Sequence, residues 1–365
     1  MQNGNNHTGI FKKLLRNKAA LAGLAIIVPA VLICIFGYLI APDNTPDADL
    51  QTVEIQSKPP GFTQQFLKLP LQDPPTVGVF QKLFFGAPAK YKYLPIKDSH
   101  VDGDSLLVNK YVDADTSVRE SYSMNSISSG HPEKISDYIL LKKYFFGTDA
   151  FGRDILSRII IGTRVSMLVG LIAVLISLTI GILLGALAGN YRGKTDSVIM
   201  WLVNVTWSIP TLLLVFSVTL TIGKGFWQIF VAVGLTLWVS VARLVRGQVM
   251  VVKEAEYVQA AKALGFRDSR IIFRHILPNI IGPVMVIAAG NFATAIIIEA
   301  GLSFLGIGVQ PPQPGWGLMM KENYNLIITH NAVQALIPGF AIMLLVLAFN
   351  LLGNGLRDVM DVKNG

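Results

Sequence analysis

The sequence is poor in charge and in cysteine. Charged residues make up 15% of its 365 positions, against roughly 25% in an ordinary globular domain, and hydrophobic residues make up 52%. That is too little charge to cover the surface of a soluble chain of this size. The single cysteine, Cys34, cannot form an internal disulfide, which excludes a disulfide-rich secreted fold. The composition therefore predicts a polytopic, all-α membrane protein.

Six apolar runs without charge are long enough, or nearly so, to cross a hydrocarbon core that needs roughly 20 helical residues. The first, 19–41, follows a basic segment at 1–18. It is too long for the apolar part of a signal peptide, and no small-residue cleavage site follows it. We therefore expect six transmembrane helices, the first of them uncleaved. The other five runs lie between Arg164 and Arg192, between Asp196 and Lys224, between Lys224 and Arg243, at about 280–298, and at about 332–352.

The cations of the short loops gather on one side of these spans. The loop between the fourth and fifth runs alone holds Arg246, Lys253, Lys262, Arg267, Arg270 and Arg274. Because cytoplasmic loops collect Lys and Arg, both termini are predicted to face the cytoplasm. The net charge of +8 then reflects membrane topology, and we expect no nucleic-acid partner.

The segment 42–143 is the only part with soluble character, and the topology places it outside the cell membrane as an insert between spans 1 and 2. Within it, 90–96 and 105–112 resemble two strands of a hairpin around the turn-like 97–104. We expect a small domain that is mostly β or mixed. The remainder, 144–365, is predicted to be the core with helices 2 to 6.

One stretch matches a loosened phosphate-loop pattern. It reads AGNYRGKT, from Ala188 to Thr195. A working phosphate loop needs a buried strand before it and a helix N-terminus behind it. Here a membrane span precedes the stretch, so we interpret it as a tight cytoplasmic turn. No nucleotide and no other cofactor is expected on this chain.

The informative loop is cytoplasmic and runs over 253–278. Its pattern predicts two short helices around a glycine. The acids Glu254 and Glu256 suit a first turn, and Lys262 suits a last turn. Gly265 supplies a left-handed stop, and Asp268 is a reasonable N-cap for the second helix. That helix is expected to run to about His275, before Pro278 opens the fifth span.

The first of these helices carries small and apolar residues on one predicted side. Tyr257, Ala261 and Leu264 follow helical spacing, with Ala260 beside them. Two interpretations remain open from the residues alone. Adjacent alanines would admit another protein's backbone, whereas the basic residues would also suit an amphipathic helix on lipid headgroups.

This loop resembles the EAA motif of permease subunits in ABC importers, in which E-A-A, three residues, G, nine residues and I-x-L-P follow each other. Two positions depart from the pattern. Gln259 replaces the glutamate, with Glu256 on the same face, and His275 replaces the isoleucine. The matching residues are Gln259, Ala260, Ala261, Gly265, Leu277 and Pro278.

Three more stretches are similar to the dipeptide, oligopeptide and nickel permeases, and to their C-type subunit. They are 13–24, 145–170 and 299–320, so the resemblance covers about 11–41 and 145–361 and omits 43–143. It implies a bacterial inner-membrane subunit that pairs with a second permease, two ATPase subunits and an extracytoplasmic binding protein. The partners would bind ATP and Mg, and the hairpin would be the coupling helix that docks on an ATPase.

Four charged residues remain as candidates. Asp149, Arg153 and Asp154 precede the second span and are either extracytoplasmic contacts or a local helix cap and ion-pair cluster. Glu299 lies near the outer end of the fifth span, where it either takes part in gating or translocation or is simply hydrated. No metal-ligand spacing is visible, and no catalytic set can be argued.

Peptide import is the function that the resemblance favours, and nickel import is the alternative within the family. An ion-coupled secondary carrier or a membrane enzyme would use ionisable groups inside its spans. The sequence places none in a span interior, which argues against both classes. The chain is therefore predicted to be a transport subunit rather than an enzyme.

Overall fold

The structure is a computed structural model that describes residues 13–71, 76–113, 115–128, 132–223, 225–328 and 332–361. Most of the predicted N-terminal segment 1–18, and Lys224 between the third and fourth runs, lie outside the described residues. The chain divides into two compact units. One comprises Met1–Val31, Ser166–Gln310 and Ile342–Gly365, and the other comprises Leu32–Val165 and Pro311–Ala341.

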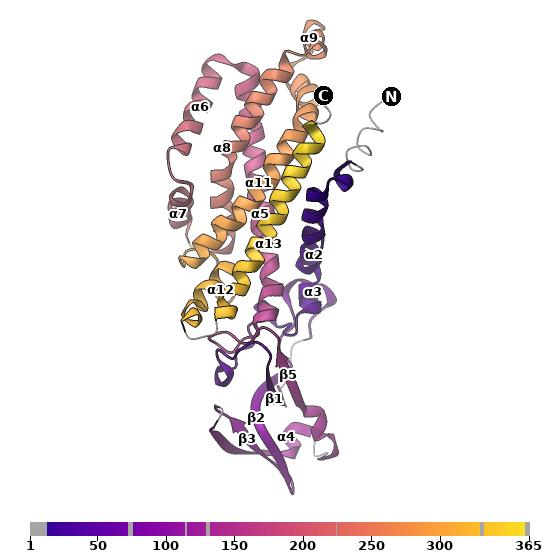
Figure 1. The fold of residues 1–365 in the computed structure, drawn as a ribbon, viewed down its shortest axis with the longest axis vertical. Coiled ribbons are helices and arrows are strands. Elements are labelled where there is room, and N and C mark those ends of the chain that lie inside the picture. The colour runs from indigo at the N-terminus through magenta and orange to yellow at the C-terminus, as the bar shows by residue number, and fades with distance from the viewer. Residues whose placement is uncertain are drawn as a thin grey trace. The chain divides into compact units, whose positions relative to one another are not determined.

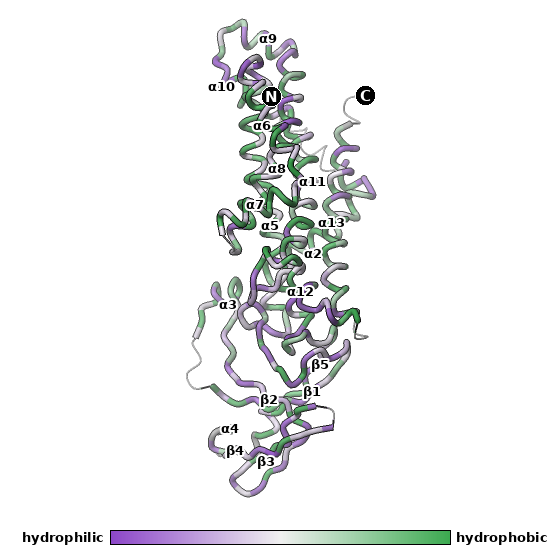
Figure 2. Tube along the Cα trace, turned by 90° about the vertical axis from the view of Figure 1, so that its left-hand side faces the viewer, coloured by the Kyte–Doolittle hydropathy of each residue, from purple (hydrophilic) through white to green (hydrophobic). Residues whose placement is uncertain are grey.

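Five helical stretches are long and apolar enough to cross a membrane (Figures 1 and 2). They correspond to the first, second, fourth, fifth and sixth predicted runs. They are α2 (Lys18–Ile40), α5 (Ile155–Tyr191), α8 (Phe226–Lys253), the continuous stretch Asp268–Phe304 and α13 (Ala332–Asp361). The fourth stretch contains α10 (Asp268–Ile271), a π-helical turn (Ile272–Ile276) and α11 (Leu277–Phe304).

The third predicted span is not one straight helix. It consists of α6 (Gly193–Trp207) and α7 (Thr211–Ile222), which meet at 94°. The break falls at Pro210, which has no N–H to donate and disfavours helical geometry in the residue before it. Counted as one broken span, the pair brings the number of spans within the described ranges to six.

Several helices extend beyond the charge-free runs. The second span begins at Ile155 rather than after Arg164, and the fourth continues past Arg243 to Lys253. A helix satisfies its own backbone hydrogen bonds, so it does not have to end where the apolar run ends. The length of an apolar run therefore predicts a span but not its ends.

Three glycines on α5 let it approach α8 closely. A methyl group placed on Gly181 would lie 2.5 Å from the Val241 Cβ, and one on Gly185 would lie 2.5 Å from the Ala242 carbonyl oxygen. Gly189 lies one turn further along the same face. Small residues at this spacing bring helix backbones together in membranes, and the sequence analysis did not use them.

The segment predicted to be an insert contains a five-stranded antiparallel sheet in the order β4-β3-β2-β1-β5 (Figure 1). Leu67, Leu94, Ile96, Leu106 and Val108 form its core with residues of α4 (Met124–Ser128). The strands are β1 (Phe62–Pro70), β2 (Tyr91–Asp102), β3 (Ser105–Tyr111), β4 (Ser117–Ser123) and β5 (Ile139–Tyr144).

The predicted hairpin is confirmed, because β2 pairs with β3. Its turn is shorter than expected, however. Asp102 pairs with Ser105, so two residues connect the strands, and Gly103 has φ +57°. Glycine suits such a tight turn because it has no Cβ to clash in the left-handed region.

Candidate functional site

The loop between α8 and α11 folds as a helical hairpin. The first helix of the hairpin, α9, covers Glu256–Ala263. Glu254 does not belong to its first turn, as the sequence suggested. Instead it caps the end of α8, and its backbone N–H donates to the Val251 carbonyl at 3.2 Å. Glu256 is therefore the acid of the first turn of α9.

Gly265 ends α9 in the left-handed conformation, as predicted, with φ +75°. Its N–H donates to the Lys262 carbonyl, and the Phe266 N–H donates to the Ala261 carbonyl. These two bonds form a Schellman motif, which satisfies the last carbonyls of the helix. A methyl group on Gly265 would meet nothing within 4 Å. The requirement for glycine here is therefore conformational and not steric.

The second half of the hairpin differs from the expectation. Asp268 is the first residue of α10 rather than its N-cap, which is Arg267. The helix then runs into α11 through the π-turn at 272–276. Pro278, the second residue of α11, has no N–H for an ordinary helical bond, and such a local irregularity accommodates the missing donor.

The two adjacent alanines of α9 face different surroundings. Ala261 is 5% exposed and packs with Val258 in a core that includes Ile271, Ile272 and Ile276. Ala260, Tyr257 and Leu264 are exposed. The prediction that Tyr257, Ala261 and Leu264 share one side is therefore wrong, because Ala261 is buried whereas the other two are exposed. The reason is that Val258 and Ala261, three residues apart, turn α9 onto the chain's own core.

The base of the hairpin is held by polar contacts. The Gln259 Nε2 donates to the Lys253 carbonyl at 2.8 Å, which joins α9 to the end of α8. Arg192 in the turn between α5 and α6 pairs with Glu254 at 2.6 Å, and the Lys253 Nζ donates to the Asn190 carbonyl. These contacts attach the hairpin to the neighbouring turn and give it a defined base.

The phosphate-loop pattern falls on that neighbouring turn. Ala188 to Tyr191 belong to the end of α5, and Gly193 begins α6. No strand precedes the stretch, so the required geometry is absent here. Among the described residues there is also no group of three His, Cys, Asp or Glu side chains that could hold a metal ion.

A second polar site is a buried ion-pair cluster in the unit that contains the sheet. Arg153 is 2% exposed, and its guanidinium contacts Asp149 at 2.6 Å, Glu322 at 2.7 Å and Asp49 at 3.0 Å. Arg158 is fully buried and lies 3.4 Å from Glu322. A buried charge is costly unless it is paired, so these five side chains depend on one another.

The environment shifts the pKa values of this cluster. Burial opposes the charged form of Arg153, but Asp149 and Glu322 raise its pKa overall. Burial raises the pKa of Glu322, although the two arginines act against that shift. Burial also raises the pKa of Asp154, which accepts a hydrogen bond from the Ser157 N–H at 3.0 Å and so caps α5.

Asp149, Arg153 and Asp154 were candidates for contact with an extracytoplasmic partner. The structure buries all three to 4% exposure or less and uses them as a helix cap and an ion-pair cluster. In the described chain their polar groups contact other residues of the same chain. The sequence did not identify Asp49 or Glu322, because such partners lie more than a hundred positions away in the chain.

Two of the stretches noted for their family resemblance, 145–170 and 299–320, meet near this cluster. Trp316, at the start of α12 (Trp316–Glu322), donates from Nε1 to the Ile159 carbonyl at 3.2 Å. A methyl group on Gly162 would lie 2.4 Å from the Pro314 carbonyl oxygen. The first turns of α5 and the segment around α12 are therefore in close contact.

Glu299 lies inside α11 and is completely buried. Its Oε1 accepts a hydrogen bond from Ser303 Oγ at 2.7 Å, and that hydroxyl accepts one from the Val309 N–H. Its Oε2 has no partner among the described residues. The expectation of a hydrated helix end is therefore wrong, because α11 continues to Phe304.

Two family models match this chain. The family model described as the binding-protein-dependent transport system inner membrane component matches residues 181–363. A second model, the N-terminal transmembrane domain of oligopeptide transport permease C, matches residues 9–60. The chain belongs to the family of binding-protein-dependent inner-membrane permeases.

Three relatives of this permease carry names that refer to glutathione, dipeptides or oligopeptides. A glutathione permease protein of Pectobacterium atrosepticum is 43% identical over 60% of this chain and 73% of its own. A dipeptide permease protein of Alkalihalophilus pseudofirmus is 41% identical over 60% and 72%. An oligopeptide permease protein of Bacillus subtilis is 38% identical over 61% and 72%. The permease is thus a multi-pass inner-membrane transport subunit.

Proposed function

We propose that this permease forms half of the translocation path of an ATP-driven importer of short peptides. A second permease completes the path, two ATPase subunits bind below it, and an extracytoplasmic binding protein delivers the cargo. Membership in a binding-protein-dependent family supports this arrangement, as do relatives named for glutathione, dipeptides and oligopeptides. The observation that carries the proposal is the family match, and the exposed hairpin supports it.

The hairpin at 253–278 is the proposed contact with the ATPase. Its exposed face carries one small and two large side chains, those of Ala260, Tyr257 and Leu264. Ala261 packs in the core beneath this face, and Gly265 ends the helix through its left-handed conformation. Because the base of α9 is tied to α8 and its buried face packs on Ile272 and Ile276 before α11, a push on the exposed face would reach both helices. Such coupling requires different contacts in the inward-facing and outward-facing states.

Glu299 is the proposed gating or translocation residue. A fully buried carboxyl group with one oxygen unpartnered in the described chain is costly in an apolar helix. Its place within α11 also removes the sequence argument against an ion-coupled carrier, which assumed that no span interior holds an ionisable group. The family match is what favours ATP-driven import over that alternative.

Uptake in a deletion strain tests the proposal. The strain would be supplied with labelled dipeptide, a longer peptide, glutathione or nickel, with the permease gene restored or absent. We expect restoration to rescue uptake of at least one peptide, and depletion of ATP to abolish it. Rescue of nickel uptake alone would identify the alternative within the family. Uptake that a protonophore abolishes while ATP is maintained would identify a secondary carrier.

A further inference from the structure

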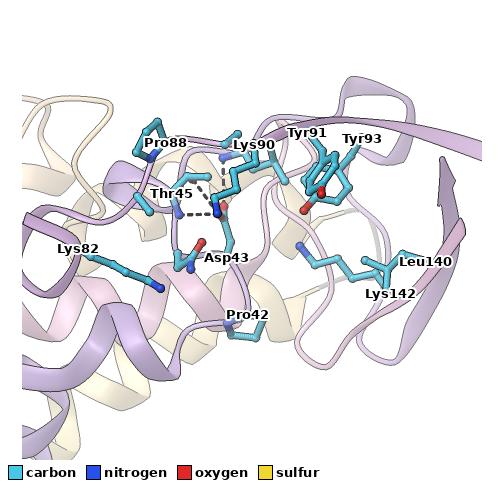
Figure 3. A pocket seen from close by; sticks show the side chains of 14 residues that line it. Pro42, Asp43, Thr45, Lys82, Pro88, Lys90, Tyr91, Tyr93, Leu140 and Lys142 are labelled. Carbon is cyan, nitrogen blue, oxygen red and sulfur yellow. Dashed lines mark hydrogen bonds between the residues drawn. The ribbon is translucent and has the colours of Figure 1, made fainter. Parts of the chain in front are cut away.

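A pocket of about 430 Å³ lies in the unit that contains the sheet. Its walls are formed by the turn at 42–45, the stretch 87–91, and strands β2 and β5, together with Leu50 and Lys82. Figure 3 shows the Lys82 and Lys142 side chains entering from different sides, with Lys142 extending toward the hydroxyls of Tyr91 and Tyr93. Its volume is within the range of small-ligand sites.

The lining carries an excess of positive charge. Lys82, Lys90 and Lys142 contribute three ammonium groups, and the described residues provide no carboxylate partner for any of them. The one acid in the lining is Asp43. Its oxygens already accept bonds from the Thr45 N–H, the Thr45 hydroxyl and the Leu50 N–H. The pocket therefore offers ammonium groups that have no carboxylate partner among the described residues, although that of Lys142 lies 5.0 Å from the Tyr144 ring centroid. It suits an anion.

The walls are fixed in place by the backbone. The Ala87 N–H donates to the Asn44 carbonyl at 2.9 Å, and the Leu71 N–H donates to the Lys90 carbonyl at 3.1 Å. A methyl group on Gly86 would lie 2.7 Å from the Asn44 carbonyl oxygen, which shows how closely these segments approach. The cavity is thus formed before any ligand arrives.

A short helix beside the pocket exposes apolar side chains. Helix α3 (Val79–Phe85) carries Lys82, while Val79, Phe80 and Phe85 are 83%, 81% and 70% exposed. Phe84 is also exposed, and its ring stacks on that of Phe80. Such a concentration of exposed apolar side chains marks a surface that meets lipid or protein.

This helix lies level with the last turn of α2 and with the start of the charge-free part of α5. The Arg164 Nη1 donates to the Phe84 carbonyl at 2.9 Å, and its guanidinium lies 5.0 Å from the Tyr38 ring. Tyr38 is in the last turn of α2, and the charge-free run of α5 begins directly after Arg164. The pocket itself begins at Pro42, two residues beyond α2. Both features therefore lie at the height of the lipid headgroups.

We propose that α3 and the adjacent pocket form a binding site for an anionic phospholipid. The phosphate of the headgroup occupies the pocket among Lys82, Lys90 and Lys142, and the apolar part of the lipid lies against Phe80 and Phe85. Phenylalanine and lysine in this arrangement are typical of helices that lie in the interface of a bilayer. The site anchors the sheet unit to the membrane, and it does not depend on the cargo of the importer.

The first test measures lipid affinity on the full chain. Native mass spectrometry in detergent would titrate phosphatidylglycerol, phosphatidylcholine with the same acyl chains, and glycerol 3-phosphate. We expect a preference for phosphatidylglycerol that falls about fivefold for each of Lys82→Gln, Lys90→Gln and Lys142→Gln, since a basic residue near an anionic membrane contributes about 1 kcal/mol.

The matched controls are Lys92→Gln and Lys143→Gln. These lysines neighbour Tyr91, Tyr93 and Lys142 on β2 and β5 but project from the opposite strand face, so both variants should retain the affinity of the wild type. Equal binding of the two lipids, or an equal loss in the controls, would overturn the proposal. Glycerol 3-phosphate that binds as tightly as the lipid would also overturn it, because the site would then serve a soluble anion.

The second test locates α3 relative to the bilayer in the assembled importer. A nitroxide would be attached to Phe85→Cys in a Cys34→Ser background, with Val101→Cys on the exposed part of β2 as the control. We expect the label at position 85 to collide with oxygen and not with a water-soluble nickel complex, and the label at 101 to do the opposite. Collisions of the label at 85 with the nickel complex would overturn the proposal. A label at 85 that collides with neither quencher would also overturn it, and would indicate that a protein covers α3.

Discussion

The Gln259 side chain donates a hydrogen bond to the Lys253 carbonyl at 2.8 Å, so α9 is fastened to the end of α8. An ionised glutamate, the residue of the family pattern, has no proton to donate there. The departure from the pattern therefore has a structural consequence. At the base of the hairpin a side-chain amide, rather than a carboxylate, makes the contact with α8.

Replacing Gln259 should loosen this base. A typical hydrogen bond contributes about 1 kcal/mol, so amides of α9 should exchange with solvent about fivefold faster in Gln259→Met. Gln259→Glu should show the same increase or more, because a carboxylate would repel the carbonyl. Hydrogen exchange on the purified full chain measures both. Unchanged exchange in both variants would show that the bond does not hold the hairpin.

Gly265 should tolerate asparagine and not valine. At φ +75° a β-branched residue is strained, at a cost of about 1–2 kcal/mol, whereas asparagine tolerates the left-handed region. The open space around Gly265 leaves conformation as the only obstacle. Gly265→Val should lower both uptake and ATPase association, and Gly265→Asn should retain most of each. Equal loss in the two variants would point to a steric role instead.

Glu322 should make the stability of the chain depend on pH. Burial raises its pKa in the folded state, so the group's stabilising contribution is complete below the ordinary carboxyl pKa and is lost as pH rises through the folded value. Glu322→Gln removes this titration. As pH rises through the carboxyl range, the melting temperature of the wild type should therefore fall relative to that of the variant. A constant difference across that range would contradict the assignment.

Removing the Arg153 cation from the same cluster should destabilise the chain more than Glu322→Gln does. Arg153→Met leaves Asp149, Asp49 and Glu322 without their main cation. Breaking a buried pair in this way costs about 3–5 kcal/mol. Thermal unfolding of the full chain should show a much lower midpoint than for Lys143→Gln, a change to an exposed lysine nearby. Equal midpoints would mean that the cluster does not stabilise the unit.

Glu299→Gln should impair transport while leaving the protein in the membrane. The amide keeps the size of the carboxyl group and can still accept from the Ser303 hydroxyl, but it cannot carry a charge. Uptake at saturating and limiting peptide should fall, with membrane abundance unchanged. Ser303→Ala serves as the comparison, because it removes the hydroxyl and leaves the acid. Normal uptake in Glu299→Gln would make the residue a structural one.

The features that the sequence predicted are local ones. Apolar run length located the long helices, the left-handed stop at Gly265 followed from a glycine after a helical pattern, and a turn between two strand patterns gave the β2–β3 hairpin. Each depends on a few neighbouring residues. The break at Pro210 was visible as a proline, but its angle depends on packing that no local pattern specifies.

The features that the sequence missed depend on distant residues. Arg153 contacts Glu322, 169 positions further along the chain. Strand β1 pairs with β5, although β2, β3 and β4 lie between them in the sequence. The orientation of α9 is another case. Its eight residues could place either alanine inward, and the core around Ile272 decides in favour of Ala261. Periodicity in so short a helix does not determine which face is buried.

The most direct test of the account uses these two alanines. Ala260→Trp enlarges the exposed face of the hairpin, while Ala261→Trp overpacks the core beneath it and should cost about 1–3 kcal/mol of stability. We predict that Ala260→Trp folds and pairs normally, loses ATPase subunits on co-purification, and shows no stimulation of ATP hydrolysis by peptide-loaded binding protein. Normal association with normal stimulated hydrolysis in Ala260→Trp would contradict the claim that this hairpin couples the permease to its ATPase.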